Sequence, residues 1–258
     1  MNKNQFFNLK RFTNYSKNLL LINAKSMLIS VAVLFVVMFL LQFSSMPRGK
    51  SMMEYPISNY AIYFTFYIVV LGVFIGSGFK PFNQKVNTQN YLAVPVSTFE
   101  KYLTEFLFRV VIGTIGLFVI YWIAVNLARY AAILTLTEPT EIVPFRYSTF
   151  FKDMFEHFDA AQITVVILSV AFAYISLFNV RLFFTKNGFI KALLTLSTLL
   201  FAFITLLYYI VKYIFEPMRD KYASVNFEVS ENYISSILIV SIVGLSIFGY
   251  FKLKEKEL

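Results

Sequence analysis

Few residues in this chain are suited to acid–base, nucleophilic or metal chemistry. Among its 258 residues there is no cysteine and one histidine, His157. A zinc site needs several histidine, cysteine or carboxylate ligands at short spacing, whereas His157 has only Glu156 directly beside it. We therefore expect His157 to be a surface residue, and we expect neither a metal site nor a catalytic group in this chain.

The chain shows neither the membrane-embedded acids of an ion-coupled carrier nor the glycine-rich loop that binds ATP. All fourteen aspartates and glutamates lie outside the long apolar stretches, whereas carriers driven by ion gradients usually hold an acid or a histidine inside the membrane. No G-x-x-x-x-G-K-[ST] loop is present to bind the phosphates of ATP. Coupling to sodium bound only by backbone carbonyls is an alternative that the sequence does not exclude. Any dependence on ATP must come from a partner.

The composition predicts a chain that lies mostly in lipid. It is 58% hydrophobic and 14% charged, which is too apolar for one water-soluble core. The net charge of +9 is scattered between apolar stretches, so we expect no nucleic-acid partner. Six stretches are long enough to cross a bilayer as helices. They are Ser26 to Ser45, Tyr60 to Phe79, Phe106 to Leu127, Ile163 to Phe184, Ile190 to Phe215 and Tyr233 to Tyr250.

The predicted fold class is an all-α polytopic membrane protein with six transmembrane helices in residues 26–250. Basic residues favour the cytoplasmic side of a membrane. With both termini cytoplasmic, the inner side holds fourteen basic and four acidic residues, a balance of +10, and the outer side a balance of −2. The opposite topology would reverse the bias, so the tail at 251–258 is also expected to be cytoplasmic.

Two segments outside the spans are expected to be amphipathic helices at the membrane surface. In residues 1–25, apolar side chains such as Phe12 and Leu19 alternate with Lys10, Arg11 and Lys17. A solvated basic tail is the alternative, because asparagines weaken the helical pattern. In residues 148–159, phenylalanines fall at helical spacing opposite a charged face, which predicts a helix on the outer leaflet.

The segment between the second and third spans, residues 80–105, is the most informative loop. Pro95 interrupts any helix before it, and Ser97 with Glu100 three residues later forms the pattern of a capping box. A new helix should therefore begin near Thr98. Tyr91, Leu92, Val94 and Val96 are more apolar than a free loop requires. We expect them to pack on the membrane or on another protein, with simple structural packing as the alternative.

Some residues inside the spans have small or polar side chains that could position helices. Gly72 and Gly76 form a G-x-x-x-G pair, which allows close approach of two helices within one subunit or at a dimer seam. Asn126, Asn179 and Ser176 are expected to bridge neighbouring helices, and the alternative is that they line a path through the membrane. Aromatic residues near the outer ends of spans predict an interfacial belt. They are Tyr60, Tyr121, Trp122, Tyr130, Tyr213 and Tyr233.

The stretch Asn90-Tyr-Leu-Ala-Val-Pro-Val-Ser-Thr-Phe-Glu-Lys-Tyr-Leu103 is similar to the "L-P-x-S-x-x-E-K" stretch of ABC-2-type ABC transporter permeases. Six helices, cytoplasmic ends and an amphipathic N-terminal segment also resemble that bacterial family. The resemblance implies that residues 80–105 carry a coupling helix, which docks on a separate nucleotide-binding subunit. The implied contact residues are Tyr91, Leu92, Val94, Pro95, Phe99, Glu100 and Lys101.

The same resemblance implies a permease subunit, and an exporter rather than an importer, in the bacterial cytoplasmic (inner) membrane. Its partners would be an ATP-binding subunit, which holds ATP and magnesium, and a second copy of the chain or a sister permease. The sequence departs from the polysaccharide exporters of the family because its last outer loop has no apolar re-entrant helices. A membrane anchor or scaffold that moves nothing is the alternative, and an ion-coupled carrier is a third hypothesis.

Overall fold

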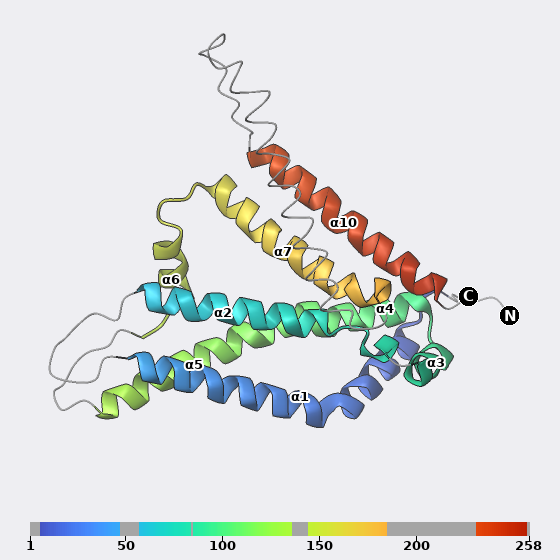
Figure 1. Cartoon of the computed structure of the whole chain (residues 1–258), viewed down its shortest axis with the longest axis horizontal. Helices are drawn as coiled ribbons and strands as arrows, with labels where there is room; N and C mark the ends of the chain where they lie inside the picture. The colour runs from blue at the N-terminus through green and yellow to red at the C-terminus, as the bar shows by residue number, and fades with distance from the viewer. Residues whose placement is uncertain (1–5, 47–56, 84, 136–143, 185–230, 257–258) are drawn as a thin grey trace, which may run out of the picture.

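A computed structural model describes residues 6–46, 57–83, 85–135, 144–184 and 231–256, and the elements within these ranges are helical (Figure 1). Short helices connect the long ones or extend them. In chain order the elements are α1 (Leu9–Ser45), α2 (Ile57–Gly76), the 3₁₀ turn η1 (Lys80–Asn83), α3 (Lys85–Ala93), α4 (Thr98–Phe106), the π-helical turn η2 (Leu107–Ile112), α5 (Gly113–Thr135), α6 (Tyr147–Met154), α7 (Ala160–Phe183) and α10 (Glu231–Glu255).

Four of the described helices are long and apolar enough to cross a membrane: α1, the continuous helix Thr98–Thr135, α7 and α10. They contain the predicted first, third and sixth spans and nearly all of the fourth. The apolar part of α2, Tyr60–Gly76, is shorter, and the predicted fifth span, Ile190 to Phe215, lies outside the described residues. The described part of the chain is therefore all-helical, and its four candidate spans indicate a multi-pass membrane protein.

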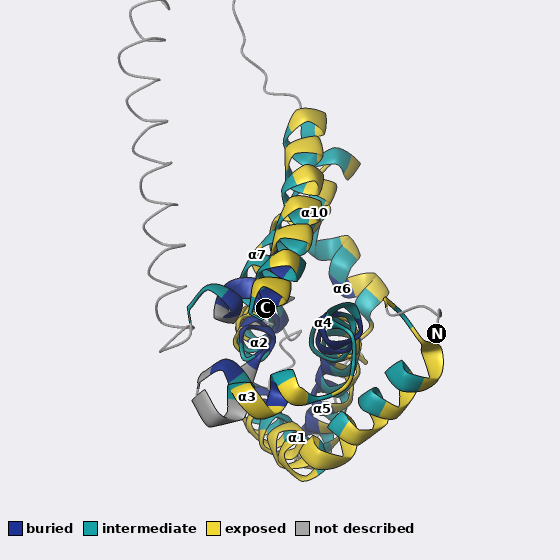
Figure 2. Ribbon diagram, turned by 90° about the vertical axis from the view of Figure 1, so that its right-hand side faces the viewer, coloured by how far each residue is buried: buried dark blue, intermediate teal, exposed yellow. Residues whose placement is uncertain are grey.

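The surfaces of α1 and α10 are apolar and open, as expected of helices that face lipid. Ile22 and Leu28 on α1 are 82% and 70% exposed, and Val240 on α10 is 71% exposed. Figure 2 shows both helices with long exposed stretches. Exposure of such side chains to water is unfavourable by about 25 cal/mol per Å² of apolar surface. Their natural surroundings are therefore the hydrocarbon of a membrane.

The interior lies where α2 packs between α5 and α7, with α1 against α5 and α10 against α7. Tyr121 is fully buried at its centre. Its hydroxyl donates to the carbonyl of Tyr60 at 3.0 Å and lies 3.3 Å from the donor Nε2 of Gln42. The prediction that Tyr60 and Tyr121 belong to an interfacial belt is therefore wrong, whereas Trp122 and Tyr130 are exposed as expected.

The predicted interfacial segment at residues 1–25 is not a separate helix where the structure describes it, because α1 runs without a break from Leu9 to Ser45. Its 37 residues make a helix of about 55 Å at 1.5 Å per residue, well beyond the roughly 30 Å of hydrocarbon. Figure 1 shows that α1 bends, so that its N-terminal part turns toward α4. Nearly half of α1, the part before Ser26, is thus free to lie outside the apolar layer.

The second predicted surface helix, 148–159, is observed as the shorter α6, Tyr147–Met154. Phe150 on α6 is buried, and its ring lies 5.3 Å from the ring of Phe64 on α2. Asp159 then caps α7 through reciprocal hydrogen bonds with Gln162. The phenylalanines of this segment therefore pack partly on α2 instead of only facing lipid.

Candidate functional site

The segment between α2 and the long helix folds into η1, α3 and a short loop at Val94, Pro95 and Val96. The predicted capping box that ends this loop is confirmed. Ser97 Oγ accepts a hydrogen bond from the Glu100 amide at 3.2 Å, and Glu100 Oε2 accepts one from the Ser97 amide at 3.1 Å. Helix α4 begins at Thr98, as expected, because the capping box pairs two of the amides that have no helical partner at its start, those of Ser97 and Glu100.

The Glu100 carboxylate also fixes the start of α1 to the start of α4. Glu100 is fully buried, and Arg11 reaches it with Nε at 2.7 Å from Oε2 and Nη2 at 2.9 Å from Oε1. Such a bidentate pair is stronger and more specific in its geometry than the pair that a lysine ammonium would form with the carboxylate. The backbone amide of Asn8 also donates to Glu100. The Ser97 hydroxyl donates to the carbonyl of Phe6 at 2.6 Å, so the two helix starts form one unit.

Aromatic rings join the last turn of α10 to the same unit. The rings of Phe6 and Phe99 stack at 4.6 Å, and the ring of Tyr250 on α10 lies 6.2 Å from that of Phe99. Stacked and edge-on pairs at such distances add attraction beyond burial alone. The described ends of the chain therefore lie together, beside the residue 80–105 segment, as Figure 1 shows.

One buried amide ties α4, α7 and α10 together below this cluster. Asn179 on α7 accepts from the Tyr102 hydroxyl at 3.1 Å and donates to the Leu245 carbonyl at 3.2 Å. Gly249 makes room for it, because a Cβ atom there would lie 2.0 Å from Asn179 Oδ1. The predicted bridge between helices is confirmed for Asn179, whereas Asn126 on α5 pairs with the backbone of Phe145, in the segment just before α6.

Three of the predicted partner-contact residues point into the protein. Lys101 is 1% exposed, and its ammonium donates to the Leu92 carbonyl at 3.1 Å and lies 5.7 Å from the centre of the Tyr91 ring. Tyr91 is itself buried against Phe82, with ring centres 5.5 Å apart. Glu100 is occupied by Arg11. Their side chains therefore build the site and are not on its surface.

The other four partner-contact residues are accessible to different degrees. Pro95 is exposed, whereas Leu92, Val94 and Phe99 are half-buried. Ala93, at the end of α3, is also exposed. Of the predicted contact segment, the loop around Pro95 and the adjoining end of α3 are therefore the parts most accessible to a partner. Contact with a partner stays a prediction.

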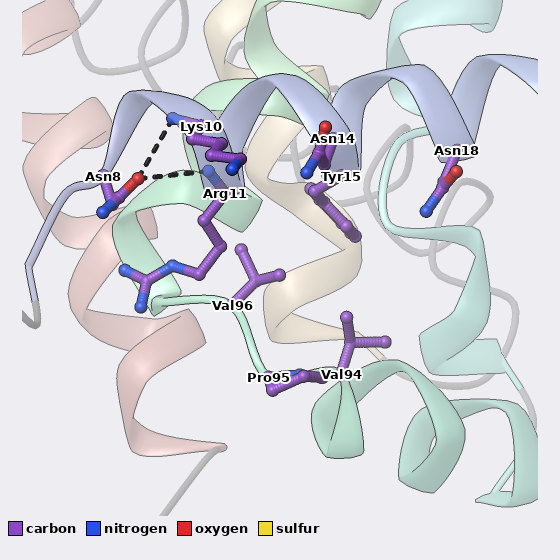
Figure 3. Close-up of a pocket in the computed structure, with 9 residues that line it drawn as sticks. All are labelled: Asn8, Lys10, Arg11, Asn14, Tyr15, Asn18, Val94, Pro95 and Val96. Atoms are coloured by element: carbon purple, nitrogen blue, oxygen red, sulfur yellow. Dashed lines mark hydrogen bonds between the residues drawn. The ribbon is translucent and has the colours of Figure 1, made fainter.

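A groove of about 450 Å³ runs between this loop and the N-terminal part of α1. Figure 3 shows side chains of α1 directed toward the loop across it. One wall is polar and basic, and the other is the apolar loop. The lining residues are Asn8, Lys10, Arg11, Asn14, Tyr15, Asn18, Val94, Pro95 and Val96.

The 80–105 segment is linked to the membrane part through one helix and one arginine. Residues Thr98–Thr135 form a single helix of 38 residues, interrupted by the π-helical turn at Leu107–Ile112. Within this turn, Arg109 Nε lies 2.9 Å from Glu105 Oε2, and its Nη1 donates to the Ser77 hydroxyl at 2.6 Å. Arg109 therefore connects the helix that contains α4 and α5 to the residue that follows α2.

The glycines of the G-x-x-x-G pair lie within the packed interior. A Cβ on Gly72 would lie 3.3 Å from Leu177 Cδ1 and 3.7 Å from Tyr174 Cε1 of α7. Gly76, one turn later, is buried as well. Gly72 thus has a packing role inside the subunit, and a dimer seam at these glycines stays a prediction.

In the part of the chain that the structure describes, no three histidine, cysteine or acidic side chains come together as metal ligands, and His157 is exposed. The sequence matches no protein-family model and no curated protein, and the structure matches no solved structure. The fold and the contacts described above are therefore what any proposal for this chain must rest on.

The sequence pattern missed the partners that complete the site. The capping box drew attention to Glu100, but nothing in its surroundings pointed to Arg11, 89 residues away. Gly249 carried a weak signal, because glycine inside an apolar helix often marks a close approach. For its partner Asn179, the sequence predicts a bridge between helices but does not indicate which residues it contacts.

Proposed function

We propose that this chain is the membrane-spanning subunit of a transporter that takes its energy from a separate ATP-hydrolysing subunit. In this proposal the chain crosses the bacterial cytoplasmic membrane six times with both ends in the cytoplasm. The ATPase subunit, which binds ATP and magnesium, docks on the exposed loop around Pro95 and the end of α3. A second copy or a sister permease completes the transport path, and the direction is export.

One observation carries most of this proposal: the exposed loop is joined without a flexible connection to a helix that is long enough to cross the membrane. The loop ends at the capping box of Ser97 and Glu100, and helix Thr98–Thr135 starts at the next residue. Arg11 and Arg109 brace this helix against α1 and α2. A rigid connection of this kind passes on the motion of a docked partner, whereas a mobile loop would absorb it.

The charge distribution supports the same orientation. The balance of +10 against −2 favours a cytoplasmic position for the Pro95 loop, where ATP is available. The resemblance of Asn90 to Leu103 to the coupling stretch of ABC-2-type permeases points to the same surface. An ion-coupled carrier is less well supported, because the acids of the sequence lie outside the apolar stretches.

A membrane scaffold that binds the same partner but moves nothing is the second candidate function. It would use the same exposed loop, so binding alone does not separate the two proposals. Reconstitution of the purified complex in liposomes does. A transporter subunit should change the ATP hydrolysis rate of its partner when substrate is present, whereas a scaffold should leave that rate unchanged.

The proposal is tested first by purifying the tagged chain from membranes of its own bacterium. We expect a P-loop ATPase to copurify, and we expect Pro95→Asp to reduce its recovery severalfold without lowering the unfolding midpoint, because the Pro95 side chain is exposed. Leu134→Asp, at an exposed position on α5, is the matched control. Full recovery of the ATPase with the double variant Ala93→Asp/Pro95→Asp would contradict the proposal.

A further inference from the structure

The groove between the N-terminal part of α1 and the loop at Val94–Val96 has a chemistry that the proposed docking of an ATPase does not use. Its α1 wall carries Lys10, Asn14 and Asn18, all exposed, and none of its nine lining residues is acidic. Figure 3 shows that the side chain of Asn18 is directed from α1 toward the loop. Ammonium and amide groups in such a wall can donate several hydrogen bonds to one anion.

Phosphate oxygens are well matched to these donors. The Lys10 ammonium carries a full positive charge and three donors, and each asparagine amide adds two donors and one carbonyl acceptor. A charged donor paired with an anionic oxygen makes a shorter and stronger hydrogen bond than a neutral pair. The asparagine carbonyls can also accept from hydroxyl groups on the same ligand. A phosphodiester that carries hydroxyls therefore fits the wall better than a plain carboxylate.

The position of the groove relative to the membrane indicates that a phosphate bound there belongs to a lipid. Residues 26–45 of α1 form about 30 Å of helix, which fills the hydrocarbon layer. Lys10, Asn14 and Asn18 then lie beyond the edge of that layer, where headgroups are found. Exposed apolar side chains, Leu20, Leu21 and Ile22, lie on α1 between the groove and the span. They offer contacts for acyl chains, which a soluble phosphate could not use.

We infer that this groove binds the headgroup of an anionic phospholipid, such as phosphatidylglycerol. Lys10 pairs with the phosphate, Asn14 and Asn18 bond its oxygens and the headgroup hydroxyls, and Val94 and Val96 contact the glycerol and upper acyl carbons. The bound lipid connects α1 to the loop ahead of α4. The inference depends only on the membrane location of the chain, so it stands or falls separately from the proposed transport function.

The test uses the full chain purified in a neutral detergent and titrated with phosphatidylglycerol, followed by native mass spectrometry. We expect one tightly held phosphatidylglycerol, and much weaker binding of phosphatidylcholine and of inorganic phosphate. The triple variant Lys10→Gln/Asn14→Ala/Asn18→Ala should bind phosphatidylglycerol about tenfold more weakly, since it loses one charge and two amides. Lys17→Gln is the matched control, because Lys17 is an exposed lysine of the same helix outside the groove.

Three results would overturn the inference. Equal weakening by Lys17→Gln would show general attraction to a basic surface instead of a site. Equal binding of both lipids would show that the groove does not recognise the net negative charge and the hydroxyls that phosphatidylglycerol has and zwitterionic phosphatidylcholine lacks. Loss of an acidic partner protein in the triple variant, with lipid binding unchanged, would assign the groove to protein docking. Lys10→Gln alone replaces the triple variant if the latter has a lowered unfolding midpoint.

Discussion

Arg11 on α1 holds Glu100 on α4 through two side-chain hydrogen bonds, with Nε 2.7 Å from Oε2, although the two residues are 89 positions apart. The Glu100 side chain is fully buried, whereas that of Arg11 is 34% exposed. Removal of the arginine therefore leaves a buried carboxylate with two backbone amides and no counter-ion. Loss of the arginine alone should therefore cost more stability than loss of both partners.

Arg11→Gln should lower the free energy of unfolding by about 1–3 kcal/mol, where the exposure of the guanidinium keeps the value below that of a fully buried pair. The double variant Arg11→Gln/Glu100→Gln should be more stable than Arg11→Gln alone, because the uncompensated charge is gone. Unfolding midpoints in detergent measure both effects. Purely additive losses would contradict the pairing, and Lys17→Gln, on the exposed face of α1, should change little.

Gly249→Ala should separate α7 from α10, because its methyl group would lie 2.0 Å from Asn179 Oδ1. The hydrogen bond from Tyr102 to Asn179 would be lost with this displacement. We expect a loss of about 2 kcal/mol, in the range of overpacked interiors, measured as a lower unfolding midpoint. Gly244→Ala is the matched control on the same helix, since no atom lies within 4 Å of its added carbon. A similar loss from both variants would show that the effect is not steric.

Arg109→Gln should be more damaging than Arg109→Gln combined with Glu105→Gln. Glu105 is 4% exposed, and the single variant leaves its charge unpaired, at a cost of about 2–3 kcal/mol. Both variants lose the contact with Ser77. The difference between their unfolding midpoints therefore measures the effect of the unpaired Glu105 charge. A double variant that is less stable than the single one would contradict this account.

The positions of Leu134 and Lys254 test the orientation proposed for the chain. Leu134 is 86% exposed near the end of α5, and Lys254 is exposed in the last turn of α10. The chain has no cysteine of its own, so a single introduced thiol gives no background. In right-side-out membrane vesicles, an impermeant maleimide should label Leu134→Cys and leave Lys254→Cys unlabelled. Labelling of both or of Lys254→Cys alone would contradict cytoplasmic termini.

The sequence predicted well those features that depend on residues close together in the chain. The capping box of Ser97 and Glu100 placed the start of α4 correctly, because its hydrogen bonds span three positions. Apolar length placed the α1, α7 and α10 spans for a similar reason. The proposed fifth span falls outside the described residues, so its existence stays a prediction.

Features that depend on which face of a helix meets another helix were not predictable. Tyr60 and Tyr121 are expected near the outer ends of their predicted spans, but both face the interior, where the Tyr121 hydroxyl donates to the Tyr60 carbonyl. Glu100 and Lys101 are charged residues at a helix start, where solvent exposure is the usual outcome. Their burial depends on Arg11 and on the Leu92 carbonyl, and no local pattern reveals these partners.

Crosslinking from Pro95 tests the central claim, that an ATPase subunit docks on this loop, most directly. A photoactivatable group is attached by maleimide to Pro95→Cys in inverted membrane vesicles from the cells that produce the chain natively, and Lys254→Cys, exposed and proposed to lie on the same side, serves as the control. We predict that mass spectrometry identifies a P-loop ATPase attached at Pro95→Cys and none at Lys254→Cys. No ATPase at Pro95→Cys, or equal capture at both positions, would contradict the account.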